Sequence, residues 1–324
     1  MRLDVVCFGE ILWDFFETRS RGAEPIAREF RRELGGAPAN VATGLARLGM
    51  RAAVVGGVGR DRFGEALVAH LRNDGVDVRF VARLPNRTGL TFVTRDARGE
   101  PKFIFFRHES ADVSIRAAHV TPAMGRARWA LVGTSTLMTP ELQKATFRFL
   151  QAVQLARGHL MVDLNVRAHL WPNPRAMRRA IEDLSSRADL IKASDADLRA
   201  VSGNASVRWL ERHAPRASWL ITRGRGTASA IGQHGEVHAQ ALRARCVDAT
   251  GAGDAFIAGS LATLVRAGAT PGTSAWRDAA VWRAALQAGH VMGSKAVSKL
   301  GAVAGLQALA RARSVIDRVG RSTP

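Results

Sequence analysis

The segment "RCVDATGAGDAFIAG" (residues 245–259) contains the residue types that best suit catalysis. The apolar spacing at its end predicts a helix, which places Gly251, Ala252 and Gly253 at the helix start. The first N–H groups of a helix lack intrahelical partners and carry a positive partial charge, so a start without bulky side chains can bind an anion. Asp254 adds a carboxylate to the same turn. This carboxylate could act as a general base, although an acid in a first helical turn can also be merely structural.

A second group of polar residues follows a predicted strand in "VDLNVRAHLW" (residues 162–171). Asp163, Asn165 and Arg167 occupy alternate positions, so in an extended chain they would point the same way. Polar side chains that converge at the carboxyl end of a strand are typical of the ligand crevice of a doubly wound sheet. Chance alternation in a loop is the other explanation.

Two more motifs come directly after predicted strands. In "IKASDADL" the polar residues are Lys192, Ser194 and Asp197, and simple helix capping by the serine would explain them without a ligand. In "LITRGRGTA" the residues Gly224 and Gly226 could approach a nucleotide closely, although a glycine-rich hairpin turn is the commoner explanation.

A glycine pair precedes the first predicted helix in "GGAPANVATGLARLG" (residues 35–49). Gly35 and Gly36 allow positive φ or close approach of the backbone to a ligand. Asn40 offers both a donor and an acceptor. Taken alone, the motif could also be a tight turn into a helix.

Strand-like and helix-like segments alternate along most of the chain. This order predicts an α/β fold with a doubly wound, mainly parallel sheet and helices on both faces. We expect strands at 4–10, 51–59, 129–135, 159–165, 188–194 and 218–224, and helices at 38–49, 61–75, 140–157, 174–187 and 195–213.

Two segments interrupt this order. Residues 13–33 and 89–108 read as extended strands, the second pair joined by the turn "DARGE", and together they predict a small antiparallel sheet that projects from the main domain. The remaining residues, 1–12, 34–88 and 109–324, would form the α/β core.

The composition excludes several function classes. The formal charge of +19 suggests nucleic acid, but only five of the 47 basic residues are lysine and the arginines are scattered without interleaved aromatics, so no nucleic-acid role is expected. No GxGxxG follows the first strand, and the nine histidines show no HExxH spacing, so neither a dinucleotide nor a zinc site is predicted.

The two cysteines, Cys7 and Cys246, both lie in apolar, strand-like sequence and are expected to be buried core thiols. No signal-peptide pattern and no apolar run of membrane-spanning length occurs in the sequence. We therefore expect a cytoplasmic protein without a membrane partner.

The motifs "GGAPANVA", "DLNVRAHLW", "KASDADL" and "DATGAGDAF", in this order and spacing, resemble those of the ribokinase-like (phosphofructokinase B type) carbohydrate kinases. The resemblance covers roughly residues 4 to 310. "GGAPANVA" together with "FFRHESAD" (residues 105–112) is most similar to the fructokinases of this family.

The resemblance implies transfer of the γ-phosphoryl group of ATP to a sugar hydroxyl with Mg²⁺, on a Rossmann-like α/β domain with a small β-sheet lid. Asp254 matches the catalytic base, and Gly251, Ala252 and Gly253 match the anion hole. The expected sugar-binding residues are Asp14, Gly35, Gly36, Asn40, Arg107, Asn165 and Arg167, with Asp254. The expected nucleotide-binding residues are Lys192, Ser194, Thr222, Gly224, Gly226, Gly251 and Gly253.

The resemblance also implies that Asp197 holds Mg²⁺ through water, that Asp248 could bind a monovalent cation such as K⁺, and that lid strands could pair in a homodimer. The family's usual Asn-x-x-Glu is Ser194-x-x-Asp197 here, with an acid one methylene shorter. The chain has no tyrosine, so the tyrosines of related acid-sugar kinases cannot be present.

Fructose is the expected substrate. 2-Keto-3-deoxygluconate is the alternative, because its carboxylate could pair with Arg107 or Arg167. Another sugar or a nucleoside would also suit a kinase of this family. A sugar sensor without turnover is a third hypothesis, and the intact Asp254 argues against it.

Overall fold

The main body of the protein is a nine-stranded sheet covered by helices. The computed structural model describes residues 2–18, 27–95, 101–171, 173–307 and 309–321. The strands run in the order β13-β12-β11-β10-β9-β8-β1-β4-β5. Their bounds are β1 Leu3–Phe8, β4 Ala52–Gly59, β5 Val81–Leu84, β8 Ala127–Gly133, β9 His159–Asp163, β10 Leu190–Ser194, β11 Ser218–Thr222, β12 Thr227–Gly232 and β13 Gly235–Gln240.

The pairings from β5 to β11 are all parallel, whereas β12 and β13 add an antiparallel edge. Along the chain, strands are added on one side of β1 first (β4, β5) and then on its other side (β8 to β11). The strand order therefore reverses at β1 and β8. In doubly wound sheets, the ligand crevice lies beyond the carboxyl ends of the strands at such a point.

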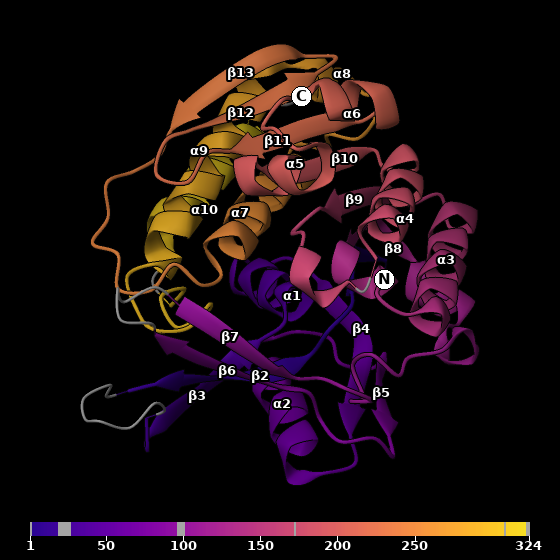
Figure 1. Ribbon diagram of the computed structural model, residues 1–324. Helices are drawn as coiled ribbons and strands as arrows, with labels where there is room; N and C mark the ends of the chain where they lie inside the picture. The colour runs from indigo at the N-terminus through magenta and orange to yellow at the C-terminus, as the bar shows by residue number, and fades with distance from the viewer. Residues whose placement is uncertain (1, 19–26, 96–100, 172, 308, 322–324) are drawn as a thin grey trace.

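Helices cover both faces of this sheet, as the alternating pattern predicts (Figure 1). Their bounds are α1 Ala37–Arg47, α2 Arg62–Asn73, α3 Pro140–Leu155, α4 Pro174–Ser186, α5 Asp195–Ser202, α6 Arg208–His213, α7 Ala252–Arg266, α8 Ser274–Arg277, α9 Ala279–Ala296 and α10 Ala310–Arg321. Short 3₁₀ turns are η1 Ala117–His119, η2 Pro122–Gly125, η3 Thr134–Leu137 and η4 Ala168–Leu170.

Strand β1 shows how the sheet divides the core into two. Val5 and Cys7 face α1, α2, α7, α9 and α10, while Val6 and Phe8 face α3 to α6. All four side chains are fully or almost fully buried. Successive residues of a strand point to opposite faces, so an unbroken apolar run is what a strand covered on both faces requires.

A second sheet of four strands lies against one end of the main body, at the lower left of Figure 1. Its order is β3-β2-β6-β7, with β2 Leu12–Glu17, β3 Phe30–Gly35, β6 Leu90–Arg95 and β7 Pro101–Phe106. The outer pairs β2–β3 and β6–β7 are antiparallel, as expected, but the central pair β2–β6 is parallel. The expected turn "DARGE" and residues 19–26 lie outside the described residues. We call the four-stranded sheet the lid.

The expectation for Cys246 is wrong. Cys7 is buried in β1, but Cys246 is exposed, in a segment without strand pairing before α7. The neighbouring Val247 is 46% exposed and donates its backbone N–H to the carbonyl oxygen of Val297 at 2.8 Å, so this segment bonds to the end of α9 rather than to a strand. Among the described helices, none is long and apolar enough to cross a membrane.

Candidate functional site

The start of α7 has the open geometry that an anion site needs. Gly251 occupies the N-cap position with a left-handed φ of 74°, and no side chain caps the helix there. A Cβ at this position would lie 2.3 Å from the Cβ of Ala302, so only glycine fits. The N–H of Ala252 donates to the carbonyl oxygen of Ala249 at 3.3 Å, and the other N–H groups of this turn can meet a phosphoryl oxygen directly.

Asp254 lies in the first turn of α7 and is 9% exposed. Its Oδ2 accepts a hydrogen bond from Nδ2 of Asn40 at 2.8 Å. Burial and the charge of Asp163 raise the pKa of Asp254 to about 6, against the opposing effects of Asn40, Lys192 and Arg167. The carboxylate is thus ionised at neutral pH but basic enough to accept a proton.

Asn40 has a second feature that points to a ligand. Its Oδ1 is buried and has no hydrogen-bond partner within the described part of the chain. A buried acceptor without a partner costs free energy. A hydroxyl donor bound beside Asp254 would remove that cost.

Lys192 lies between two acids at the carboxyl ends of β9 and β10. Its Nζ is 3.1 Å from Oδ1 of Asp163 and 4.0 Å from Oδ2 of Asp197. Burial acts to lower the pKa of Lys192, but the neighbouring carboxylates outweigh it and hold the pKa above its usual value. A Cβ on Gly253 would be 3.2 Å from this Nζ, so the ammonium lies directly against the start of α7.

Ser194 and Asp197 form a capping box at the start of α5, as the capping explanation predicts. Ser194 Oγ accepts from the N–H of Asp197, and Asp197 Oδ2 accepts from the N–H of Ser194 at 2.8 Å. The other oxygen, Oδ1, accepts from the N–H of Val166 at 2.7 Å. Both oxygens of Asp197 are thus engaged, and within the described ranges no group of three or more His, Cys, Asp or Glu could hold a metal ion.

Asp14 extends from the lid toward the same place. It lies on β2, next to Thr91 of β6, and a Cβ on Gly35 would be 2.5 Å from its Oδ2. Burial raises the pKa of Asp14 to about 7, and the charge of Asp254 contributes to the rise. The lid and the core therefore each supply one acid to the same site, and the two acids are close enough to affect each other's charge.

The motif "GGAPAN" brings the backbone close to the site of the two acids. Gly36 is the N-cap of α1 with a φ of 95°. A Cβ at Gly36 would lie 2.3 Å from the carbonyl oxygen of Glu10. The glycine is needed for the conformation and for the close approach, which places Asn40 on the first turns of α1.

The argument that placed Asn165 and Arg167 by alternation is wrong. Strand β9 ends at Asp163, Asn165 has a left-handed φ of 32°, and Arg167 is exposed before η4. The charge of Arg167 still acts on Asp254, because it opposes the rise of that pKa. Arg167 is therefore near the site although the strand does not direct it there.

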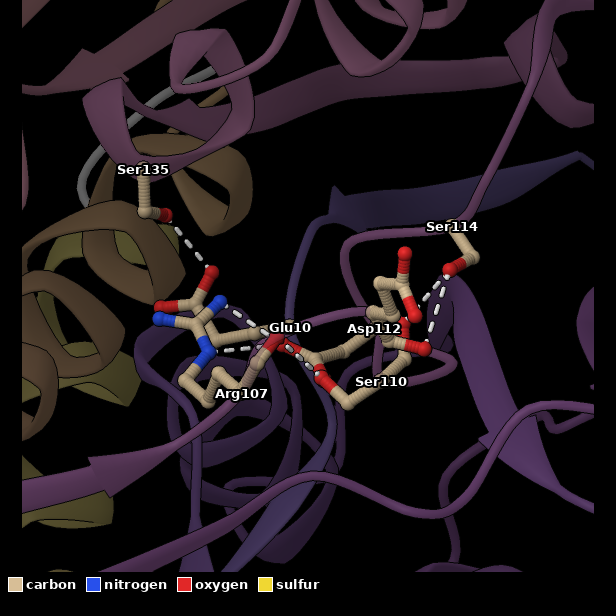
Figure 2. A network of polar contacts seen from close by, with 7 residues as sticks. Glu10, Arg107, Ser110, Asp112, Ser114 and Ser135 are labelled. Carbon is tan, nitrogen blue, oxygen red and sulfur yellow. Dashed lines mark hydrogen bonds and ion pairs between the residues drawn. The ribbon is translucent and has the colours of Figure 1, made fainter.

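Arg107 follows the last lid strand and is buried. Its Nε and Nη2 are both 2.7 Å from Oδ2 of Asp112, whose side chain is fully buried. Figure 2 shows this pair together with Ser110, and on its other side Glu10 with Ser135. Neither Asp112 nor Glu10 follows a pattern in the sequence that marks it as a partner of Arg107.

A cavity of about 580 Å³ lies beside the start of α7. The expected nucleotide residues Thr222, Gly224 and Gly253 line it, whereas Lys192, Ser194 and Gly226 do not. Its other lining residues include Cys246, Phe256 and His290, which the motifs did not indicate. His290 is held by Ala239, whose carbonyl oxygen lies 3.0 Å from its Nε2.

Asp248 is buried beneath the loop that leads into α7. Its Oδ1 accepts from the N–H and the hydroxyl of Thr250 at 3.1 and 2.8 Å, and its Oδ2 accepts from the N–H of Gly301 at 3.0 Å. The carboxylate thus ties the start of α7 to the turn after α9.

Known proteins are similar to this chain in sequence and in fold. A model of the pfkB family carbohydrate kinases matches residues 2–309. A probable fructokinase-2 of Arabidopsis thaliana is 35% identical over 272 residues, 81% of each chain. A fructokinase of Xylella fastidiosa, solved with bound ATP, has a TM-score of 0.84 at 27% identity and covers 98% of this chain and 99% of its own. An aminoimidazole riboside kinase of Salmonella enterica has a TM-score of 0.82 at 25% identity, with 97% and 100% covered. The chain therefore belongs to the pfkB family of carbohydrate kinases.

Proposed function

We propose that this protein is an ATP-dependent fructokinase, which transfers the γ-phosphoryl group of ATP to a hydroxyl of fructose. The observation that carries the proposal is the buried carboxylate of Asp254 in the first turn of α7, where no side chain caps the helix. The relatives named as fructokinases and the structure of one with bound ATP support the choice of substrates.

In this proposal the sugar binds between the lid and the core. Asp14 and the free Oδ1 of Asn40 accept hydrogen bonds from its hydroxyls. One hydroxyl oxygen forms a bond to the γ-phosphorus while its proton moves to Asp254 and the bond from phosphorus to the leaving ADP oxygen breaks. A positioned base of this kind typically contributes about 10² to 10⁴ in rate.

The protein's positive groups act on the phosphoryl group while it is transferred. The N–H groups at Gly251 to Gly253 and the ammonium of Lys192 lie together at the start of α7. Lys192 is buried and residues 251–253 are half-buried, and all of these groups are held in place by the fold, so they stabilise the developing charge without having to reorganise. The nucleotide lies in the cavity lined by Thr222 and Gly224, with its phosphates toward Gly253.

The acids present fit Mg²⁺ only in a water-mediated form. Both oxygens of Asp197 already accept hydrogen bonds from the protein, and Mg²⁺ usually keeps several of its waters and contacts phosphates directly. Asp197 would therefore hold the ion through water, and the ion when bound neutralises phosphate charge. We also propose a K⁺ site beside Asp248, because that carboxylate supports the loop into α7.

The lid offers a surface for a second copy of the chain. Phe103, Ile104 and Phe106 on the edge strand β7 are 44%, 40% and 60% exposed. Exposed apolar edge strands commonly mark an interface. We propose a homodimer through this strand. We also propose that the protein is located in the cytoplasm, because ATP is available there.

Comparing substrates tests the proposed function. With ATP and Mg²⁺, we expect kcat/KM for fructose to exceed that for ribose, adenosine, 2-keto-3-deoxygluconate and fructose 6-phosphate by at least about tenfold. The measurement is ADP release coupled to detection of the phosphorylated sugar. A higher kcat/KM for any other acceptor would contradict the proposal, and so would rapid ATP hydrolysis without sugar.

Activity should decrease in acid, because Asp254 must be ionised to accept the proton. Its pKa is raised to about 6, so below this pH the protonated form predominates. We expect kcat/KM for fructose to fall about tenfold per pH unit below about 6. Enzyme returned from acid to about pH 8 should regain full activity, which excludes unfolding as the cause.

The pH at which kcat/KM begins to decrease distinguishes two acids. A decrease that begins near pH 7 would assign it to Asp14, whose pKa is raised to about 7. A profile that stays flat down to about pH 5 would contradict the base assignment.

A further inference from the structure

Arg107 does not present a free charge to the sugar site. Its Nε and Nη2 both donate to one oxygen of Asp112 at 2.7 Å, with side-chain exposures of 9% and 0%. The second oxygen of Asp112 lies 2.5 Å from the hydroxyl of Ser110, which also lies 2.9 Å from the carbonyl oxygen of Arg107. The pair is thus buried, with two guanidinium nitrogens donating to one carboxylate oxygen, and Ser110 holds it in place from both ends (Figure 2).

Two more carboxylates lie around the same guanidinium. Burial acts to lower the pKa of Arg107, but the charges of Asp112, Glu10 and Asp14 outweigh it and raise the pKa. Glu10 is 9% exposed at the end of β1, and its Oε2 accepts from the hydroxyl of Ser135 at 2.6 Å. Asp14 is only partly ionised at neutral pH, because its pKa is about 7, but Asp112 and Glu10 together already place more than one negative charge beside the single positive charge of Arg107.

The excess of negative charge around Arg107 determines which ligands its guanidinium can bind. A carboxylate or phosphate placed near Arg107 would meet three acids in a poorly solvated place, where repulsion between like charges is strong. A neutral hydroxyl meets no such repulsion. It can accept from Nη1 of Arg107, which donates to no described residue.

We propose that Asp112 is a specificity-determining residue: by holding Arg107, it makes the sugar site select neutral sugars and exclude sugar acids and sugar phosphates. This inference rests on the proposed function. It is separate from the binding of fructose itself, because it concerns the ratio between two substrate classes. A purely structural Arg107–Asp112 pair, which only anchors β7, would leave that ratio unchanged.

Asp112→Asn tests the inference, because it removes the charge and keeps the shape. We expect the ratio of kcat/KM for 2-keto-3-deoxygluconate to that for fructose to rise at least about tenfold. Ser110→Ala is the matched control, since it removes a hydrogen bond to Asp112 but no charge, and its ratio should stay at the wild-type value. A folded Asp112→Asn variant with an unchanged ratio, or an equal rise in Ser110→Ala, would overturn the inference.

Glu10→Gln keeps the test decisive if Asp112→Asn does not fold. It removes a charge near Arg107 and leaves the Arg107–Asp112 pair in place. The ratio of kcat/KM for 2-keto-3-deoxygluconate to that for fructose should therefore rise by a smaller factor. An unchanged ratio in that variant would overturn the inference. Failure of the proposed function would look different, because the wild-type protein itself would then have a higher kcat/KM for another acceptor than for fructose.

Discussion

Replacing Asp254 with asparagine is expected to lower kcat by at least roughly 100-fold. Asparagine has nearly the same shape and can still accept the hydrogen bond from Asn40, but it cannot accept the proton of the attacking hydroxyl. Steady-state kinetics with fructose and ATP measure the loss. KM for the two substrates should change far less than kcat, because the pocket keeps its shape.

The same substitution should not weaken the fold. Burial raises the pKa of Asp254 from 3.8 to about 6, so the native state binds this proton more tightly than the unfolded chain does. The protein therefore loses stability from this group as the pH rises through about 6. The asparagine variant has no charge to bury, so at neutral pH its free energy of unfolding should equal or exceed that of the wild type.

Glu65→Gln is the matched control for Asp254. Glu65 is also an acid in the first turn of a helix, α2, but it is exposed. If an acid in this position acted only through the helix dipole, both substitutions would have similar small effects. Turnover of Asp254→Asn close to that of the control would refute the role of Asp254 as the base.

The core of the fold could be predicted because its signals are local. Continuous apolar runs such as Val5–Phe8 require burial on both faces, and helices with one apolar stripe come between them. The two antiparallel strands β12 and β13 could not be predicted in this way. Their segments "TASAIG" and "GEVHAQ" are short and rich in small or polar residues, and their strand structure depends on the pairing of β12 with β11 and of β13 with β12.

The site was predictable only where a motif coincides with a helix start or a strand end. Asp254, Asn40 and Lys192 meet because α7, α1 and β10 bring their ends to one edge of the sheet. The partners of Arg107 are different, because Asp112 lies in a loop and Glu10 comes from the end of another strand. Such contacts depend on how the lid lies on the core, which no local pattern encodes.

The prediction for Cys246 shows the opposite error. "RCVDAT" has the β-branched and apolar residues of a strand, yet it pairs with none of the strands in the described part of the chain. Its backbone bonds instead to Val297 and its side chain lines the cavity beside Gly253. The residue types of this segment favour a strand, but its hydrogen bonds to the end of α9 determine its structure.

Lys192 is the residue whose loss should affect stability most. Lys192 is 5% exposed, and its ammonium lies between the buried acids Asp163 and Asp197. Lys192→Met keeps most of the volume but leaves these carboxylates buried without their counter-charge. Removing one partner of a buried ion pair typically costs about 3–5 kcal/mol.

We therefore expect Lys192→Met to lower the free energy of unfolding by about 3–5 kcal/mol, as measured by urea denaturation. It should also lower kcat by more than about tenfold, because a cation beside Gly253 is lost. Adding Asp163→Asn removes the unpaired charge, so the double variant should regain stability while kcat stays low. A single variant as stable as the wild type would show that the pair contributes nothing to the fold, and recovery of kcat in the double variant would show that Lys192 acts only by neutralising Asp163.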